Sequence, residues 1–203
     1  MKTLILAIAF LAGSTAVIAS GDEGKKDLNV DTSKSQIEWV GKKVTGQHQG
    51  TLDIKSGTLS VVDGMIESAN ITIDMSSIMV TDEGMDDETK GNLKGHLSSP
   101  DFFNVAEHSS ASFQLTSFKP MKGENGANYV ISGKLTIKGI TNDISFPAKV
   151  DMSKGGVSAS GNLVIDRSKW DIRYGSGSFF DNLGDKVIYD DVEIGFNLVA
   201  SSK

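Results

Sequence analysis

The chain has 203 residues, no cysteine and a net charge of −6 at neutral pH. Its hydrophobic content of 38% is that of one globular domain with a buried core, which excludes a disordered chain and a disulfide-based scaffold. Acidic and basic residues are mixed along the chain without a basic stripe, and this argues against nucleic acid as a partner.

The first residues predict export. Lys2 precedes an unbroken apolar run at 4–11, and a small residue, Ala19, lies near a suitable cleavage point. This pattern is typical of a signal peptide, because the apolar run is too short to span a bilayer; a buried N-terminal helix is the alternative. No cysteine is available for a lipoprotein anchor. We therefore expect a signal peptide over 1–20, a flexible polar leader over 21–30 and one domain over 31–203.

Beyond the leader, apolar residues recur at every second position, which predicts β-strands with one apolar face. The pattern slips once, near Ser56 and Gly57, and a bulge there would return the apolar side chains to one face. Short connections at 62–64, 138–139 and 153–156 indicate antiparallel neighbours. The predicted strands, about eight in number, cover 36–41, 51–62, 69–75, 113–116, 129–138, 143–150, 157–165 and 188–198.

Two connections differ from the rest. Residues 86–97 predict a short helix, since acidic residues begin it and Leu93 and Leu97 lie one turn apart. The acidic stretch 81–88 lacks calcium-loop spacing and is interpreted as the start of this helix. The second connection, 168–184, is long and aromatic. Long loops in compact domains commonly carry function.

Such strands form a sandwich or a closed barrel, and closure removes exposed edges. We expect an all-β, antiparallel closed barrel. Small inward residues (Gly133, Ala148, Ala159, Gly161) leave space for an apolar ligand or only relieve crowding in a filled core, and both alternatives stay open. Alternation places the following side chains inside: Trp39, Ile71, Ile73, Leu115, Phe146, Leu163, Ile194 and Phe196.

Two pairs of adjacent phenylalanines lie in the long connections. Phe102 and Phe103 follow the predicted helix, and Phe179 and Phe180 lie in the aromatic loop. Adjacent exposed Phe side chains are a liability in a soluble protein. We expect all four to turn inward at the barrel ends and narrow a ligand entrance; the alternative is that they only cap the core.

Three motifs resemble those of the YceI-like, polyisoprenoid-binding family: HLSSPDFFNVAEHSSASF (96–113), GKLTIKGITNDISF (133–146) and IDRSKWDIRYG (165–175). The first predicted strand is similar as well. The resemblance implies a lipocalin-like barrel that holds a long isoprenoid or fatty-acyl chain in an apolar tunnel, in the periplasm and without catalysis. It adds these ligand-binding candidates: Phe102, Phe103, Phe113, Leu135, Ile137, Trp170 and Tyr174. Asp171 stands where relatives often have Gly.

Catalytic and metal-binding patterns are weak. The three histidines, His48, His96 and His108, lack metal-ligand spacing, and no nucleophile motif occurs. We expect no enzyme, cofactor or metal; a structural role for His96 and His108 is favoured over headgroup or metal binding. Arg167 and Arg173 flank Trp170 and would meet a headgroup or face solvent, and the second is favoured because Arg is usually exposed.

The sequence therefore predicts an exported, periplasmic protein that carries or sequesters an isoprenoid-like or fatty-acyl lipid, for transport or storage. The alternative is a structural or interaction barrel with a filled core and no ligand. An esterase is a third hypothesis, for which no activated nucleophile is visible. We expect no membrane span, and a homodimer remains open.

Overall fold

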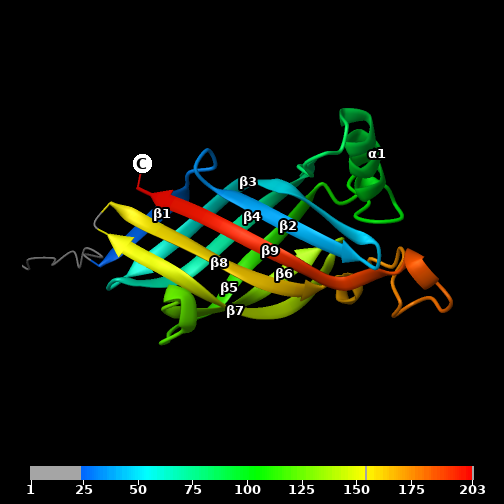
Figure 1. The fold of residues 1–203 in the computed structure, drawn as a ribbon. Coiled ribbons are helices and arrows are strands. Elements are labelled where there is room, and N and C mark those ends of the chain that lie inside the picture. Colours follow the sequence, from blue (N-terminus) through cyan, green and yellow to red (C-terminus); the bar gives the residue numbers. More distant parts are fainter. Residues whose placement is uncertain (1–23, 154, 203) are drawn as a thin grey trace, which may run out of the picture.

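Nine antiparallel strands and one helix make up the fold of residues 24–153 and 155–202, which the computed structural model describes (Figure 1). The predicted signal peptide, 1–20, lies outside these residues. The strands are β1 (Lys25–Val30), β2 (Gln36–Lys43), β3 (Gly46–Val62), β4 (Met65–Val80), β5 (Ser110–Pro120), β6 (Tyr129–Ile137), β7 (Ile140–Ser153), β8 (Gly156–Asp166) and β9 (Ile188–Ser201).

The sheet closes into a barrel. Hydrogen-bonded neighbours follow the order β3-β2-β9-β8-β7-β6-β5-β4, and β4 returns to pair with β3. These eight strands form the predicted ring, and β1 is one strand more. Closure satisfies the backbone groups that an open sheet would leave at its edges. The predicted antiparallel closed barrel is confirmed.

The prediction of a flexible leader over 21–30 is wrong for residues 25–30. Residues 25–30 form β1, whose Leu28 and Val30 are buried. β1 pairs with 58–62 of β3, and β2 pairs with 46–53 of the same strand. β1 and β2 therefore occupy one strand position between β3 and β9, interrupted by the turn at 31–35. The sequence shows no apolar alternation over the first half of β1, because its residues there are polar (Lys25, Lys26 and Asp27).

The predicted bulge in β3 is confirmed. The register with β4 shifts between Ile54 and Ser56, so Lys55 is an extra residue on β3. As a result Leu52 and Ile54 on one side of the shift, and Leu59 and Val61 on the other, are all buried. At two further shifts, after Thr51 and after Ser60, the extra residues lie on β4.

Two hairpins use the tightest turns. Asp63 and Gly64 join β3 to β4, and Lys138 and Gly139 join β6 to β7, and all four residues have positive φ angles. Two successive positive φ angles define the hairpin turn whose twist matches that of the flanking strands.

Helix α1 (Asp87–Ser98) matches the predicted helix. Asp86 caps its N-terminus by accepting a hydrogen bond from the Thr89 amide at 2.7 Å, and this bond lowers the pKa of the Asp86 carboxyl. The acidic stretch thus starts the helix. Among the described residues no helix is long and apolar enough to cross a membrane.

The long connections gather at one end of the barrel. Figure 1 shows α1, the β2–β3 turn and the β8–β9 connection at the same end, whereas β9 ends at the opposite one. The β8–β9 connection contains short 3₁₀ turns, η2 (Arg167–Trp170) and η3 (Gly184–Lys186), and a third, η1 (Glu124–Gly126), precedes β6.

Candidate functional site: an apolar cavity inside the barrel

The barrel interior holds an apolar cavity with two lobes. The helix-end lobe has a volume of about 180 Å³ and lies under α1, where Leu93, Leu97, Phe102 and Phe103 line it. The far lobe has a volume of about 150 Å³ and lies deeper in the barrel. The lobes are adjacent, because five side chains line both: Ile37, Ile73, Leu135, Ile165 and Ile194. An enclosed apolar cavity of about 150 Å³ stays dry and accepts an apolar guest.

Most sequence-predicted ligand residues line this cavity. Those in the helix-end lobe are Trp39, Ile73, Phe102, Phe103, Leu135, Ile137 and Ile194. Those in the far lobe are Ile71, Ile73, Phe113, Leu115, Leu135, Phe146, Leu163, Ile194 and Phe196. Alternation finds those on strands because every second side chain of a barrel strand points inward, whereas Phe102 and Phe103 lie in a loop.

The small inward residues do not simply leave empty space. The Phe113 ring lies over Gly133, where an added Cβ would come within 2.3 Å of the ring, and the Phe196 ring lies over Gly161. Phe146 contacts both rings, with centroid distances of 5.9 Å to Phe113 and 5.6 Å to Phe196. These glycines allow three aromatic rings to form a wall of the far lobe.

Phe102 and Phe103 turn inward as predicted. Phe102 is buried, and the two rings meet edge to face at 5.1 Å. The turn after α1 holds them: the Phe103 amide donates to the Leu97 carbonyl, and the Asn104 amide donates to the Ser99 carbonyl. Leu93 and Leu97 place the apolar side of α1 above them. Together these residues cover the helix-end lobe.

The second phenylalanine pair does not turn inward, and this prediction is wrong. Phe179 and Phe180 are exposed, at 39% and 49%, and neither lines a lobe. The Phe179 and Phe180 amides both bond to the Ser176 carbonyl, a local turn that carries the rings outward. Arg173 lies over the Phe179 ring at 5.0 Å.

Trp170 and Tyr174 lie outside the cavity lining as well. Trp170 is buried, and its Nε1–H donates to the Leu135 carbonyl at 3.1 Å, which ties the β8–β9 connection to β6. Tyr174 is half-exposed and stacks edge to face on His96 at 4.3 Å. These motif residues hold the end of the barrel together.

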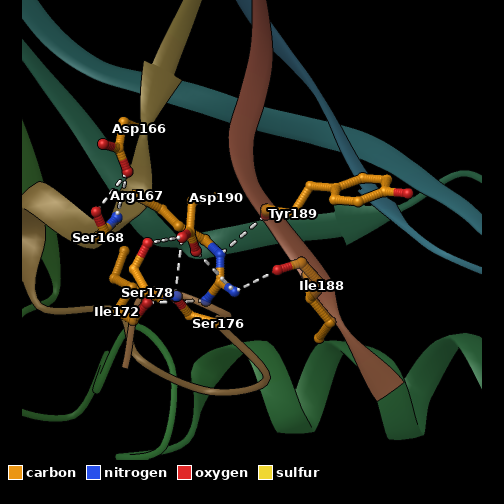
Figure 2. Close-up of polar contacts among 9 residues, drawn as sticks. All are labelled: Asp166, Arg167, Ser168, Ile172, Ser176, Ser178, Ile188, Tyr189 and Asp190. Atoms are coloured by element: carbon orange, nitrogen blue, oxygen red, sulfur yellow. Dashed lines mark hydrogen bonds and ion pairs between the residues drawn. The ribbon is translucent and has the colours of Figure 1, made fainter. Parts of the chain in front are cut away.

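Arg167 is buried, against the expectation that it faces solvent (Figure 2). Its guanidinium donates to the carbonyls of Ile172 at 2.8 Å, Ile188 at 3.0 Å and Tyr189 at 3.2 Å. Asp190 lies 3.3 Å away as its counter-ion. Burial lowers the pKa of Arg167, and the charges of Asp190 and Asp166 act in the opposite direction. Arg173, in contrast, is exposed and pairs with Asp171.

Asp190 extends the Arg167 network into the loop. Its other oxygen accepts hydrogen bonds from the hydroxyls of Ser176 at 2.9 Å and Ser178 at 2.7 Å (Figure 2). One buried ion pair therefore joins η2, the 176–178 turn and the start of β9. Because Arg167 lines the helix-end lobe, the same network forms part of the cavity wall.

Partly exposed residues line one side of the helix-end lobe, and we call this part of the lining the mouth. Its rim consists of Lys42, Lys43 and His48 of the β2–β3 hairpin and Ile188 and Tyr189 of β9. Lys42 pairs with Glu193, and His48 Nδ1 lies 2.6 Å from Asp82. The sequence did not single out these rim residues, although the lysine pair was visible at the end of a strand.

The other two histidines lie apart from any metal-binding cluster. His96 packs against Phe102 and Tyr174, and His108 lies next to Gly139. Within residues 24–153 and 155–202, no group of three or more His, Cys, Asp or Glu side chains is placed to hold a metal ion.

A closed antiparallel barrel with an apolar internal cavity is the class of protein that this fold and site define. The YceI-like domain model matches residues 28–200, and the chain belongs to this family. The predicted resemblance is confirmed, and the match begins within β1, in agreement with the placement of that strand in the barrel.

Relatives share the family in sequence. The chain is 26% identical over 159 residues to Protein YceI of Escherichia coli O17:K52:H18, covering 74% of this chain and 73% of that protein. It is 29% identical over 93 residues to a UPF0312 protein of Serratia proteamaculans, covering 46% of this chain. That match spans only 42% of the Serratia protein.

Solved structures share the fold. BcnA of Burkholderia cenocepacia is 25% identical with a TM-score of 0.60, and the match covers 85% of this chain and 99% of that one. A polyisoprenoid binding domain from Saccharophagus degradans is 17% identical with a TM-score of 0.62, covering 87% and 98%. At this identity the second likeness shows the fold alone.

Proposed function

We propose that this protein binds one isoprenoid-like or fatty-acyl chain inside the barrel and acts as an exported carrier or scavenger of that lipid. The observation that carries the proposal is the apolar cavity, whose two adjacent lobes share lining residues inside the barrel. Each buried methylene would contribute about 0.8 kcal/mol to binding. The structural neighbour described as a polyisoprenoid binding domain supports the same ligand class.

The cavity argues against the filled-core alternative. A barrel packed solidly with side chains would have no dry space in either lobe. The proposed role is binding without catalysis, because the described lining is almost wholly hydrocarbon and brings together no nucleophile and general base.

Native mass spectrometry of the purified full-length protein tests lipid binding. We expect a bound lipid, or, after delipidation, uptake of added farnesol or 1-hexadecanol at a ratio of one per chain. Uptake should raise the Tm, since a ligand that binds only the folded state stabilises it. Protein that stays empty with both probes would overturn the proposal.

Export has a separate test. The proposed signal peptide at 1–20 predicts that the protein recovered from the periplasmic fraction of its bacterial cells lacks these residues. N-terminal sequencing of that protein checks the cleavage. Recovery of uncleaved chain in the cytoplasm would contradict export while leaving lipid binding intact.

A further inference from the structure

The charged residues that line the helix-end lobe are all basic, and they line it almost entirely with their carbon atoms. Lys42, Lys43 and Arg167 line the helix-end lobe together with His48, and no Asp or Glu of the described chain lines either lobe. This contrasts with a protein that carries more acidic than basic residues and a net charge of −6. The basic residues at the mouth are therefore a local exception to the negative net charge of the protein.

These basic residues differ in their ion-pair and hydrogen-bond partners. Arg167 is engaged deep in the wall by three carbonyls and Asp190, so its charge is already compensated. Lys42 pairs with Glu193 at the surface, with exposed fractions of 42% and 51%, and such a pair is weak and screened. Among the described residues no ion pair or side-chain hydrogen bond engages Lys43.

His48 lies beside Lys43 on the same rim. Its Nδ1 faces Asp82, whose other oxygen accepts the Gln49 amide hydrogen at 2.8 Å. These bonds orient the ring and leave Nε2 as its second polar atom. The rim thus combines one unpaired ammonium with one oriented imidazole.

We propose that the mouth is a headgroup subsite for an anionic lipid, in which Lys43 and His48 hold a phosphate or carboxylate while the chain enters the cavity. This rests on the proposed lipid-binding function and specifies its ligand class. The head stays at the rim because moving an ionised group into the apolar lobes would be very costly. The unpaired Lys43 ammonium at the rim then favours an anion over an uncharged head of the same chain.

Matched ligand pairs test the subsite: farnesyl phosphate against farnesol, and palmitate against 1-hexadecanol. Each competes with an uncharged fluorescent dye for the cavity of the full-length protein. We expect the anionic member to bind about three- to tenfold more tightly, as for one partly screened charge contact. If only farnesyl phosphate binds more tightly than its alcohol, the anionic ligand is an isoprenyl phosphate. If only palmitate binds more tightly than its alcohol, the anionic ligand is a fatty acid.

Variants assign the effect to the rim. Lys43→Met keeps the length of the side chain and should remove the anionic advantage without changing the affinity for farnesol or 1-hexadecanol. Lys43→Arg should retain it. The matched control is Lys25→Met on the outward face of β1, away from the mouth, which should leave all four affinities unchanged.

Equal binding of the anionic and uncharged members by the wild-type protein would overturn the subsite and leave lipid binding standing. Survival of the advantage in Lys43→Met would equally reject Lys43 as the cause. Failure of all four compounds to displace the dye would instead reject the proposed function itself.

Discussion

At the scale of single residues, Arg167 shows how a buried charge shapes the end of the barrel. Its three carbonyl partners lie on the β8–β9 connection and the start of β9, so the guanidinium fixes both segments beside the cavity. The planar fork of Arg suits several acceptors at once, which a lysine could not match.

We predict that Arg167→Met destabilises the protein by about 3 kcal/mol, because Asp190 and three carbonyls lose their buried partner. Arg173→Met, a change at an exposed arginine of the same connection, should stay within about 0.5 kcal/mol of wild type. Urea unfolding of both variants measures the two values. A loss below about 1 kcal/mol for Arg167→Met would show that water replaces the guanidinium at little cost.

The two phenylalanine pairs give the clearest contrast between similar sequences. Phe102 packs under α1, with Arg167 over its ring at 5.5 Å, whereas Phe180 is half-exposed on the 176–180 turn. Period-two alternation does not operate in loops, so the sequence could not separate the pairs.

Phe102→Ala is expected to cost about 3–5 kcal/mol of unfolding free energy, since it removes a buried aromatic ring and enlarges the cavity. Phe180→Ala should cost no more than about 0.5 kcal/mol. Chemical denaturation of the pair checks this. Similar losses at both positions would mean that Phe180 packs inward in solution.

At the scale of elements, β1 is the strand that sequence reasoning missed. Its outward residues are polar, and only Leu28 and Val30 face the core, which is too short a pattern to recognise as a period of two. The pairing with β3 identifies β1 as a strand, because residues 58–62 of β3 would otherwise lack a hydrogen-bonded neighbour on that side.

Leu28→Ala should destabilise the protein by about 2–4 kcal/mol if β1 packs as part of the barrel. Its neighbour Asn29 faces outward, and Asn29→Ala is the matched control, with an expected change within about 0.5 kcal/mol. Equilibrium unfolding measures both variants. If neither substitution changes the free energy of unfolding, residues 25–30 do not pack as a strand of the barrel.

The turn that separates β1 from β2 carries a pH-dependent contact. Hydrogen bonds from Lys34 and Ser33 lower the pKa of Asp31 to about 2. A carboxyl whose pKa is lowered on folding adds stability above its unfolded pKa, and this contribution disappears as the pH falls toward the folded pKa. Asp31→Asn keeps the acceptor for Ser33 but loses the ion pair with Lys34.

We therefore expect Asp31→Asn to lower the Tm at pH 6 and the difference from wild type to shrink between about pH 4 and pH 2. Thermal melts across this range measure it. An independent NMR titration of the Asp31 carboxyl should have its midpoint near 2. A midpoint at the ordinary value, or a Tm difference that does not depend on pH, would contradict the contact.

At the scale of the whole molecule, the barrel holds two adjacent apolar lobes. Ile73 lies where the lobes meet, since it lines both. Affinity for a homologous series of alcohols should rise by about 0.8 kcal/mol per methylene until the chain fills both lobes, and then level off.

Ile73→Phe is predicted to narrow the junction, so that affinity levels off at a shorter chain, with a stability cost of about 1–3 kcal/mol. Ile140→Phe, a change at an exposed isoleucine at the start of β7, is the size-matched control. Calorimetric titration with alcohols of increasing length measures both series. A plateau at the same chain length in all three proteins would show that the chain does not pass this junction.

Alternation, turn residues and helix signals in the sequence were sufficient for the closed barrel, α1 and most of the lining, because inward and outward positions of a strand differ in hydrophobicity. They also placed the bulge in β3, since Leu52 and Leu59 cannot face one side without it. These properties are local, and neighbouring residues along the chain encode them.

Only the tertiary structure decided which loop aromatics cover the cavity, that Arg167 is buried and that β1 completes a strand position. Each of these depends on partners distant in the sequence: Phe102 on α1 and Arg167, Arg167 on β9, β1 on β3. A loop side chain has no periodic constraint, so its direction follows from the surfaces that the closed barrel presents to it.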